Sequence, residues 1–225
     1  MTAGGDTGDA ATDGMRSDTV RAIGFSDAVF AIVITLLVLD LRVPETAPGG
    51  MLRALRDQWP VYLAYVTSYL YVAVNWLNHK GTFHRVRCAD RGLHWANLGV
   101  LFSVALLPFV TGLVSRAVEE GDVADERVAV SAYALVGVLL SMTWLWLYHY
   151  LSRHRELLEP HVTARFFEAE RVRALLGVLA YAIAGLVGVL LSIPAALVVL
   201  LLLPVFYGLS SNGSYDLRRR LRPRR

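Results

Sequence analysis

The chain has 225 residues, of which 55% are hydrophobic and 18% are charged, and its formal net charge is +3. With a mean hydropathy of +0.46, it is far more apolar than an ordinary soluble domain. Its apolar residues also come in long blocks. The composition therefore excludes a soluble globular protein and predicts a polytopic membrane protein.

Residues 1–17 are predicted to form a disordered amino-terminal tail. The stretch MTAGGDTGDAATDG is rich in Gly, Asp and Thr and almost free of bulky apolar residues. It lacks the basic segment followed directly by an apolar core that marks a signal peptide. We therefore expect the tail to precede a transmembrane domain over residues 18–210.

A helix needs about 20 apolar residues to cross a bilayer. This domain contains a succession of apolar stretches of that length. They lie at about 20–41, 59–79, 95–115, 128–149, 173–191 and 194–210. The last two form one apolar run that is too long for a single span, and its interruption at Pro194 favours a tight hairpin. The predicted fold class is therefore all-α, with six transmembrane helices.

Basic residues in the connecting segments indicate the orientation. Counted alternately from the amino terminus, the segments on one side hold seventeen Lys and Arg residues and those on the other side hold five. By the positive-inside rule, this bias predicts that both termini are cytoplasmic. Residues 211–225 form a basic cytoplasmic tail, which we expect to orient the last helix and contact anionic lipid, not nucleic acid.

Asp27 is the one ionisable side chain well inside a predicted span, where a charge is costly. Arg21 precedes it by six residues, or about 600° of helix rotation, so the two lie about 120° apart and are poor partners. The second span ends in NWLNHK, which places Trp76 and His79, with Asn75 and Asn78, at about the depth of Asp27. Two hypotheses stay open: a clamp between the first two helices, or contact of Asp27 with a transported ion.

A different surface follows this charged segment. Ile32, Leu36 and Leu39 recur at i, i+4 and i+7, and Thr35 lies at the edge of the same face. An Ile/Leu stripe on a membrane helix most often faces lipid or packs against a neighbour. The spacing by itself therefore does not indicate a pore.

The stretch RAIGFSD, residues 21–27, resembles the R-x-x-x-F-S-D signature that begins the first helix in the potassium channel family of transmembrane protein 175. The similarity continues through AVFAIVITLLVLDLRVP, through Trp76-Leu-Asn-His79 at the end of the second span, and through NLGVLFSVALLPF in the third. The second half of the chain agrees only in span count and apolar character. On these motifs the chain is identified as a bacterial member of the family.

The resemblance implies a potassium-permeable cation channel of the bacterial plasma membrane, assembled as a homotetramer and modestly selective for K⁺ over Na⁺. In that family the first helix lines the central pore, and bulky aliphatic residues form its narrow point. Carried over by position, this constriction falls on Ile32, Leu36 and Leu39. The hydroxyl layer associated with selectivity falls on Thr35.

The resemblance also assigns the signature residues. These are Arg21, Phe25, Ser26 and Asp27, while Trp76 and His79 resemble their second-helix partners in an inter-helix network. The implied partners are further copies of the chain, membrane lipid and permeant monovalent cations. Neither a cofactor nor a fixed metal ion is expected, because K⁺ is only in transit.

Asp40 and Arg42 lie at the outer end of the first predicted span. A carboxylate at that position would concentrate cations at a channel mouth, and the neighbouring guanidinium would cancel this effect. An ion pair between them at the membrane interface is the simpler interpretation.

Three other classes of function compete with a channel. A secondary transporter is disfavoured because the two halves show no repeated Gly- or Pro-interrupted helices. A membrane enzyme is disfavoured because His79, His84 and His94 have no carboxylate at metal-ligand spacing, and no Ser or Cys has an evident base. A non-conducting membrane scaffold would share every feature described above, so the sequence does not separate it from a channel.

Overall fold

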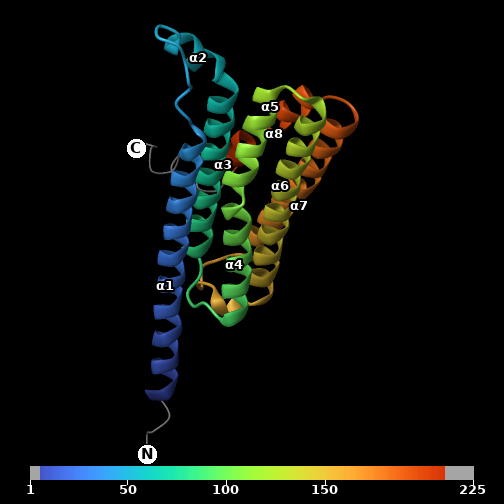
Figure 1. Ribbon diagram of the computed structural model, residues 1–225. Helices are drawn as coiled ribbons and strands as arrows, with labels where there is room; N and C mark the ends of the chain where they lie inside the picture. Colours follow the sequence, from blue (N-terminus) through green and yellow to red (C-terminus); the bar gives the residue numbers. More distant parts are fainter. Residues whose placement is uncertain (1–5, 211–225) are drawn as a thin grey trace, which may run out of the picture.

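The computed structural model describes the backbone of residues 6–210, with side chains described over 18–208 apart from Ala164 and Val205. Within this part of the chain all regular elements are helices, and one isolated β-bridge joins Val86 to Leu158. The elements in order are α1 (Asp6–Leu37), η1 (Val38–Asp40), α2 (Met51–Asp57), α3 (Trp59–Phe83), α4 (Arg91–Ala105), α5 (Leu107–Glu120), α6 (Val123–Arg153), η2 (Arg155–Leu157), α7 (Ala164–Leu190) and α8 (Ile193–Ser210). Figure 1 shows the long helices side by side, with the amino-terminal part of α1 projecting beyond the bundle. The all-α class predicted from composition is confirmed.

Four helical segments among the described residues are long and apolar enough to cross a membrane. They are Asp18–Asp40, Arg91–Glu120, Val123–Arg153 and Arg165–Leu190. The segment Ile193–Gly208 in α8 is apolar but shorter. At 25 residues α3 has the necessary length, but its many Tyr and Trp side chains make it less apolar. Four of the six predicted spans thus meet both criteria, and α3 and α8 occupy the places of the other two.

Two helices begin earlier than the sequence pattern predicts. The backbone of residues 6–17 belongs to α1, although its composition predicts a disordered tail. No proline interrupts the chain between this segment and the apolar span, so the helix can continue upstream. α7 begins at Ala164 and not near 173, because its polar first turns still bury Phe167 and Ala174 on one face. The predicted basic tail at 211–225 lies outside the described residues.

Proline positions explain two other helix ends. The third predicted span consists of α4 and α5, which meet at Leu106, and Pro108 near the start of α5 supplies no backbone N–H for a continuous helix. The predicted hairpin before Pro194 is confirmed. There the N–H groups of Leu191 and Ser192 both donate to the Val187 carbonyl at 2.9 Å, and α8 begins at the next residue.

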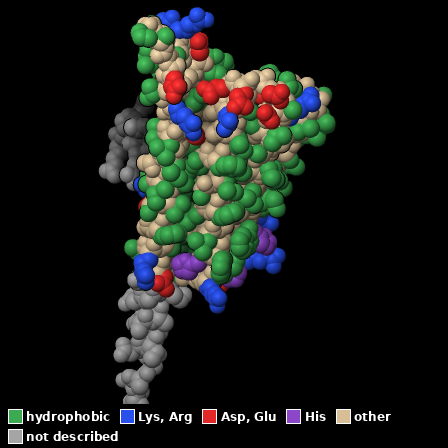
Figure 2. Space-filling view, viewed as in Figure 1, with side chains coloured by type: hydrophobic (Ala, Val, Ile, Leu, Met, Phe, Trp, Pro, Cys, Tyr) green, Lys and Arg blue, Asp and Glu red, His purple; other side chains and the backbone are tan. Residues whose placement is uncertain are grey.

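The surface has three zones along the helix axes. Figure 2 shows an apolar middle zone, a zone of acidic and basic side chains at the end that carries α2, and a zone of basic and His side chains at the opposite end. An apolar band between two charged zones is the surface that a membrane-spanning bundle presents to lipid and water. Together with the long apolar helices, it describes a multi-pass membrane protein.

Candidate functional site

The two faces of α1 have different surroundings. One face packs against the bundle through three fully buried side chains, Phe30, Val33 and Leu37. On the other face Ile32 is 57% exposed, Leu36 is 42% exposed and Leu39 is 68% exposed. The stripe predicted from the sequence spacing therefore lies on the exposed outside of the single chain.

Thr35 adds an oxygen to the edge of this exposed face. Its hydroxyl donates a hydrogen bond to the Ile32 carbonyl, with 2.7 Å between the two oxygens. Because the proton is used on the helix's own backbone, the hydroxyl oxygen keeps its lone pairs for an outside group.

The Asp27 carboxylate is held by α3. The indole N–H of Trp76 donates to its Oδ1 atom at 2.8 Å, which is the contact expected from the depth of the two residues. The Lys80 ammonium lies 5.2 Å from the centre of the Trp76 ring, so a cation stands close to this pair. Trp76 therefore acts as a bridge between the two helices, although Asp27 itself is exposed.

His79 was predicted as a second partner of Asp27, but it forms its hydrogen bond with Asn97 instead. The ring is fully buried, and its Nε2 atom lies 2.9 Å from Oδ1 of Asn97 on α4. The Asn97 amide nitrogen donates to Ser26 Oγ at 2.9 Å, and Ser26 donates to the Ala22 carbonyl at 2.8 Å. With the amide in this orientation its oxygen faces His79, so Nε2 carries the proton. The chain Ser26, Asn97 and His79 thus connects α1, α4 and α3.

Asn97 was not among the residues singled out from the sequence. It is the one carboxamide in the third predicted span, where it lies among apolar residues and is 3% exposed. A buried amide needs hydrogen-bond partners, so a single carboxamide within an apolar span was the signal that could have identified Asn97. Its partners could not be named from the sequence, because they belong to two other helices.

Arg21 and Phe25 point away from this network. Both are exposed, and among the described residues Arg21 forms neither a hydrogen bond nor an ion pair with Asp27. This agrees with the angular separation expected from the helix rotation. The seven-residue signature is therefore divided between an inward side, with Ser26, and an outward side.

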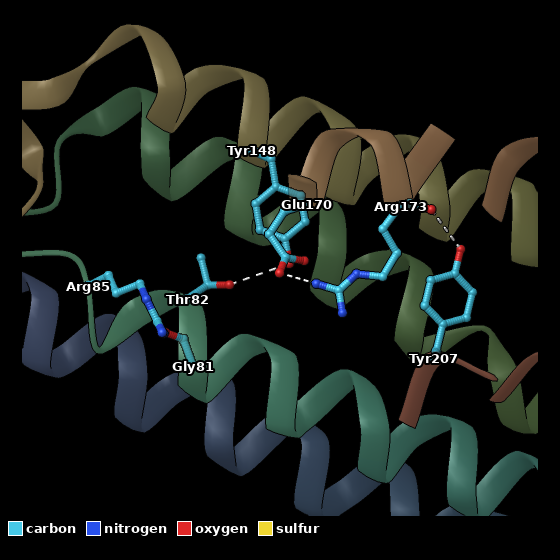
Figure 3. A network of polar contacts seen from close by, with 7 residues as sticks. All are labelled: Gly81, Thr82, Arg85, Tyr148, Glu170, Arg173 and Tyr207. Atoms are coloured by element: carbon cyan, nitrogen blue, oxygen red, sulfur yellow. Dashed lines mark hydrogen bonds and ion pairs between the residues drawn. The ribbon is translucent and has the colours of Figure 1, made fainter. Parts of the chain in front are cut away.

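A second polar network lies in the interior of the bundle, away from α1. Glu170 is 4% exposed, and it forms an ion pair with Arg173 one turn further along α7. Figure 3 shows both side chains with their neighbours from three other helices. Thr82 on α3 donates to the Tyr148 hydroxyl at 3.5 Å, Tyr148 on α6 contacts Glu170, and Tyr207 on α8 donates to the Arg173 carbonyl at 3.2 Å. The network was missed because the sequence pattern assigned residues 153–173 to a loop.

Hydroxyl and indole groups also join α3 to its neighbours at other levels. The Ser68 hydroxyl lies 2.7 Å from the Thr111 hydroxyl on α5 and 3.3 Å from the Tyr133 hydroxyl on α6. Closer to His79, the Trp144 indole donates to Asn75 at 2.8 Å. These pairs satisfy polar groups that would otherwise be costly in an apolar bundle. In the described part of the chain no group of three or more His, Cys, Asp or Glu residues is placed to hold a metal ion.

Asn97→Ala is expected to lower the melting temperature of the detergent-solubilised protein. His79 would lose its partner inside the bundle, and a buried unsatisfied polar group costs about 1–3 kcal/mol. For a chain of this size, each kcal/mol corresponds to about 2–4 °C. Asn78→Ala is the matched control, because Asn78 is only half-buried and makes no side-chain hydrogen bond among the described residues. Equal melting temperatures for both variants would show that the network does not stabilise the fold.

The fold and site together define an all-α, multi-pass membrane protein whose first helix is anchored by polar contacts on one side and open on the other. The family "Endosomal/lysosomal potassium channel TMEM175" matches residues 21–108, from Arg21 to the start of α5. A potassium channel of Streptomyces collinus is 40% identical over 194 residues, which cover 85% of this chain and 92% of that protein. The chain belongs to the TMEM175 family, which is a family of ion channels and not of enzymes.

Two further comparisons bear on the fold and on the permeant ion. The crystal structure of a lysosomal potassium-selective channel TMEM175 homolog from Chamaesiphon minutus superposes with a TM-score of 0.76 at 30% identity, covering 87% of this chain and 99% of that one. The human endosomal/lysosomal proton channel TMEM175 is 32% identical over 151 residues, which cover 63% of this chain and 30% of the human protein. The family resemblance expected from the signature is therefore confirmed.

Proposed function

We propose that the protein is a potassium-permeable cation channel in which α1 lines a central pore of a homotetramer. The observation that carries this proposal is the exposed stripe of Ile32, Leu36 and Leu39 on a helix whose other face is tightly packed. Relatives of this chain from Streptomyces collinus and Chamaesiphon minutus are named potassium channels. Copies of the chain arranged around an axis would bring the stripes together and give each exposed face a partner.

The narrow point of this pore is assigned to Ile32, followed by Leu36 and Leu39. Converging aliphatic side chains would leave a dry aperture, and such constrictions gate by dewetting. A cation crossing it loses water with little compensation, so discrimination between K⁺ and Na⁺ is modest. The Thr35 hydroxyl oxygen has lone pairs that the backbone does not use, so it would replace part of the water that the ion loses.

The signature segment serves as the anchor of the pore helix. Asp27 bonds to Trp76, and Ser26 is tied through Asn97 to His79, so two neighbouring helices fix the rotation of α1. This rotation decides which side chains face the axis. Of the two hypotheses for Asp27, the clamp is supported by its bond to Trp76. The exposed Arg21 and Phe25 are left to contact lipid headgroups or a neighbouring copy.

Orientation and domain limits complete the proposal. Six spans, formed by α1, α3, the α4–α5 pair, α6, α7 and α8, would place both termini in the cytoplasm of a bacterium, in agreement with the basic bias of the connecting segments. The channel domain covers residues 18–210, with a short tail before it and a basic tail after it that contacts anionic lipid. No cofactor is assigned, and the partners are lipid, permeant cations and identical copies.

The expected result in planar bilayers is a cation current from the purified, reconstituted protein. With KCl on one side and NaCl on the other, the reversal potential should favour K⁺ modestly. A pH gradient in a separate recording measures any proton current, because the human relative is named a proton channel. Folded tetramers that carry no cation current would contradict the proposal and favour a scaffold. Flux that occurs only with a coupled second solute would favour a transporter.

A further inference from the structure

The outward surface of α4 and α6 carries two tryptophans and two arginines near one end of the bundle. Trp95 is 58% exposed and Trp146 is 47% exposed, and both Arg91 and Arg153 are exposed as well. Figure 1 shows α4 and α6 side by side, and Figure 2 shows basic side chains gathered at the end of the molecule opposite α2. These four side chains belong neither to the stripe on α1 nor to the polar networks described above.

Two glycines on α4 fix how the two helices lie against each other. A Cβ atom on Gly92 would overlap the Tyr150 side chain of α6. A Cβ atom on Gly99 would lie 3.4 Å from the Trp146 ring, so the numbering rises along α4 while it falls along α6, and the helices are antiparallel. From Gly99 back to Gly92 is seven residues, or about 10 Å of helix. Seven residues beyond Trp146 is Arg153, which therefore lies at about the level of Gly92.

Helix rotation places all four side chains on one side of this seam. Viewed from the amino terminus of α4, Arg91 and Trp95 lie about 100° and 60° anticlockwise of the Gly92 contact. Viewed likewise along α6, Trp146 and Arg153 lie about 40° and 60° anticlockwise of the contact with α4. In an antiparallel pair, anticlockwise turns from the seam lead to the same side of both helices, and here that side is the exposed one. The two arginines therefore face outward at one level, and the indole rings lie further toward the middle of the bundle.

Both guanidinium groups lack a protein partner. Among the described residues, neither Arg91 nor Arg153 forms a hydrogen bond or an ion pair. α4 contains no acidic residue, and the carboxyl-terminal half of α6 contains none. The Asp90 carboxylate, just before α4, already accepts a backbone N–H of α4 at 2.8 Å and the Tyr150 hydroxyl at 2.5 Å. The next acid, Glu156 in η2, is exposed and directly follows a basic residue. The surface therefore presents positive charge that the described protein groups do not neutralise.

We propose that this surface binds one anionic phospholipid, with its phosphate between Arg91 and Arg153 and its acyl chains against Trp95 and Trp146. Basic groups between transmembrane helices suit anionic headgroups, and the planar guanidinium group matches the geometry of a phosphate. Tryptophan rings are favoured at the boundary between headgroups and hydrocarbon. A phosphate ion from solution would use the arginines but leave the adjoining indole rings uncovered, so a lipid fits the surface better. Binding requires neither a pore nor an ion current.

Native mass spectrometry of the full chain in detergent measures this binding, with phosphatidylglycerol as the anionic probe and phosphatidylcholine as the comparison lipid. A basic side chain close to an anionic headgroup strengthens binding about fivefold. Arg91→Gln and Arg153→Gln should therefore each weaken phosphatidylglycerol binding about fivefold, and the double variant about 25-fold, while phosphatidylcholine binding stays unchanged. The double lysine variant, Arg91→Lys/Arg153→Lys, should keep most of the affinity because it keeps both charges.

Arg127→Gln is the matched control for the glutamine variants. Arg127 is an exposed arginine near the opposite end of α6, so the substitution removes the same charge from the same helix. Its phosphatidylglycerol binding should equal that of wild type. An equal loss of binding in this control would overturn the site, because net charge would then explain the effect. Equal affinity of wild type and the double glutamine variant would overturn it directly.

A phosphatidylglycerol with a photoreactive group in its acyl chain locates the bound lipid. Labelled peptides should come from residues 91–102 and 142–153, and this labelling should fall in the double glutamine variant. Labelling confined to other segments would contradict the site. Full displacement of the lipid by millimolar inorganic phosphate would assign the arginines to a soluble anion, and loss of the tetramer in the double variant would assign the surface to a contact between copies. Either result overturns the lipid site.

The single glutamine variants decide the question if the double variant does not fold. The binding measurements are also separate from the bilayer recordings. Wild-type protein that binds the lipid at this surface but carries no current would refute the proposed function alone. Wild-type protein that carries a K⁺ current but binds both lipids equally would refute the lipid site alone.

Discussion

Ile32→Asn is expected to raise the single-channel conductance and to weaken the preference for K⁺ over Na⁺. The isoleucine is 57% exposed on the open face of α1, so the substitution removes little buried surface of the single chain. An amide at the narrow point would hydrate the aperture and offer oxygen to a passing ion. If it recovers about 1 kcal/mol of lost hydration, conductance rises about fivefold. Single-channel recording and reversal potentials in mixed KCl and NaCl measure both effects.

Val38→Asn is the matched control for this substitution. Val38 is 45% exposed, close to the exposure of Ile32, and follows it by six residues. Five steps along α1 to Leu37 and one step into the 3-10 helix η1, at about 120° per residue, turn Val38 about 100° away from Ile32. Its currents should therefore equal those of wild type. If Leu36→Asn or Leu39→Asn changes conductance while Ile32→Asn does not, the constriction lies at a different level of α1.

Glu170→Leu is expected to cause the largest loss of stability among the substitutions considered. The substitution leaves Arg173, whose side chain is only 11% exposed, without its carboxylate partner. An unpaired buried charge costs about 3–5 kcal/mol, which corresponds to a fall of about 6–20 °C in melting temperature. Tyr148 would lose a contact to the same carboxylate, so the packing of α6 against α7 also weakens. Thermal unfolding in detergent measures the effect.

The double variant Glu170→Leu/Arg173→Met separates charge from packing. Replacing both members of a buried pair by apolar side chains is often neutral or stabilising, so most of the lost stability should return. The exposed pair Arg53 and Asp57, with 3.8 Å between its charged atoms, is the control, and Asp57→Asn should melt like wild type. A single Glu170→Leu variant as stable as wild type would show that this ion pair does not hold the bundle together.

Local spacing determined the two faces of α1 before the structure was known. Residues four and seven positions apart share one side of a helix, so the stripe beginning at Ile32 was predictable from the sequence. A contact between Asp27 and the polar end of the second span was also predictable from depth in the membrane, and the structure shows that Trp76 makes it and His79 does not. The hairpin before Pro194 followed from the chemistry of proline. Each of these predictions depends on near neighbours in the chain or on depth alone.

Hydropathy and charge patterns did not predict the helix boundaries correctly where polar residues lie inside a helix. The segment 153–173 was assigned to a basic loop, yet α7 begins at Ala164 and buries Glu170 in the bundle. The composition of residues 6–17 predicted disorder, and their backbone continues α1. A polar side chain in such a segment is consistent with either a loop or a helix, because its partner is not visible in the sequence.

The sequence by itself determined a helical membrane protein, the position of the signature and the two faces of the first helix. Only the tertiary structure decided that His79 bonds to Asn97 and not to Asp27, and that Asp40 and Arg42 do not form the ion pair that the sequence suggests. Helical periodicity is a property of neighbouring residues, so it can be read along the chain. A partner on another helix depends on how each helix is rotated and crossed against the next, and packing of the whole bundle sets those angles.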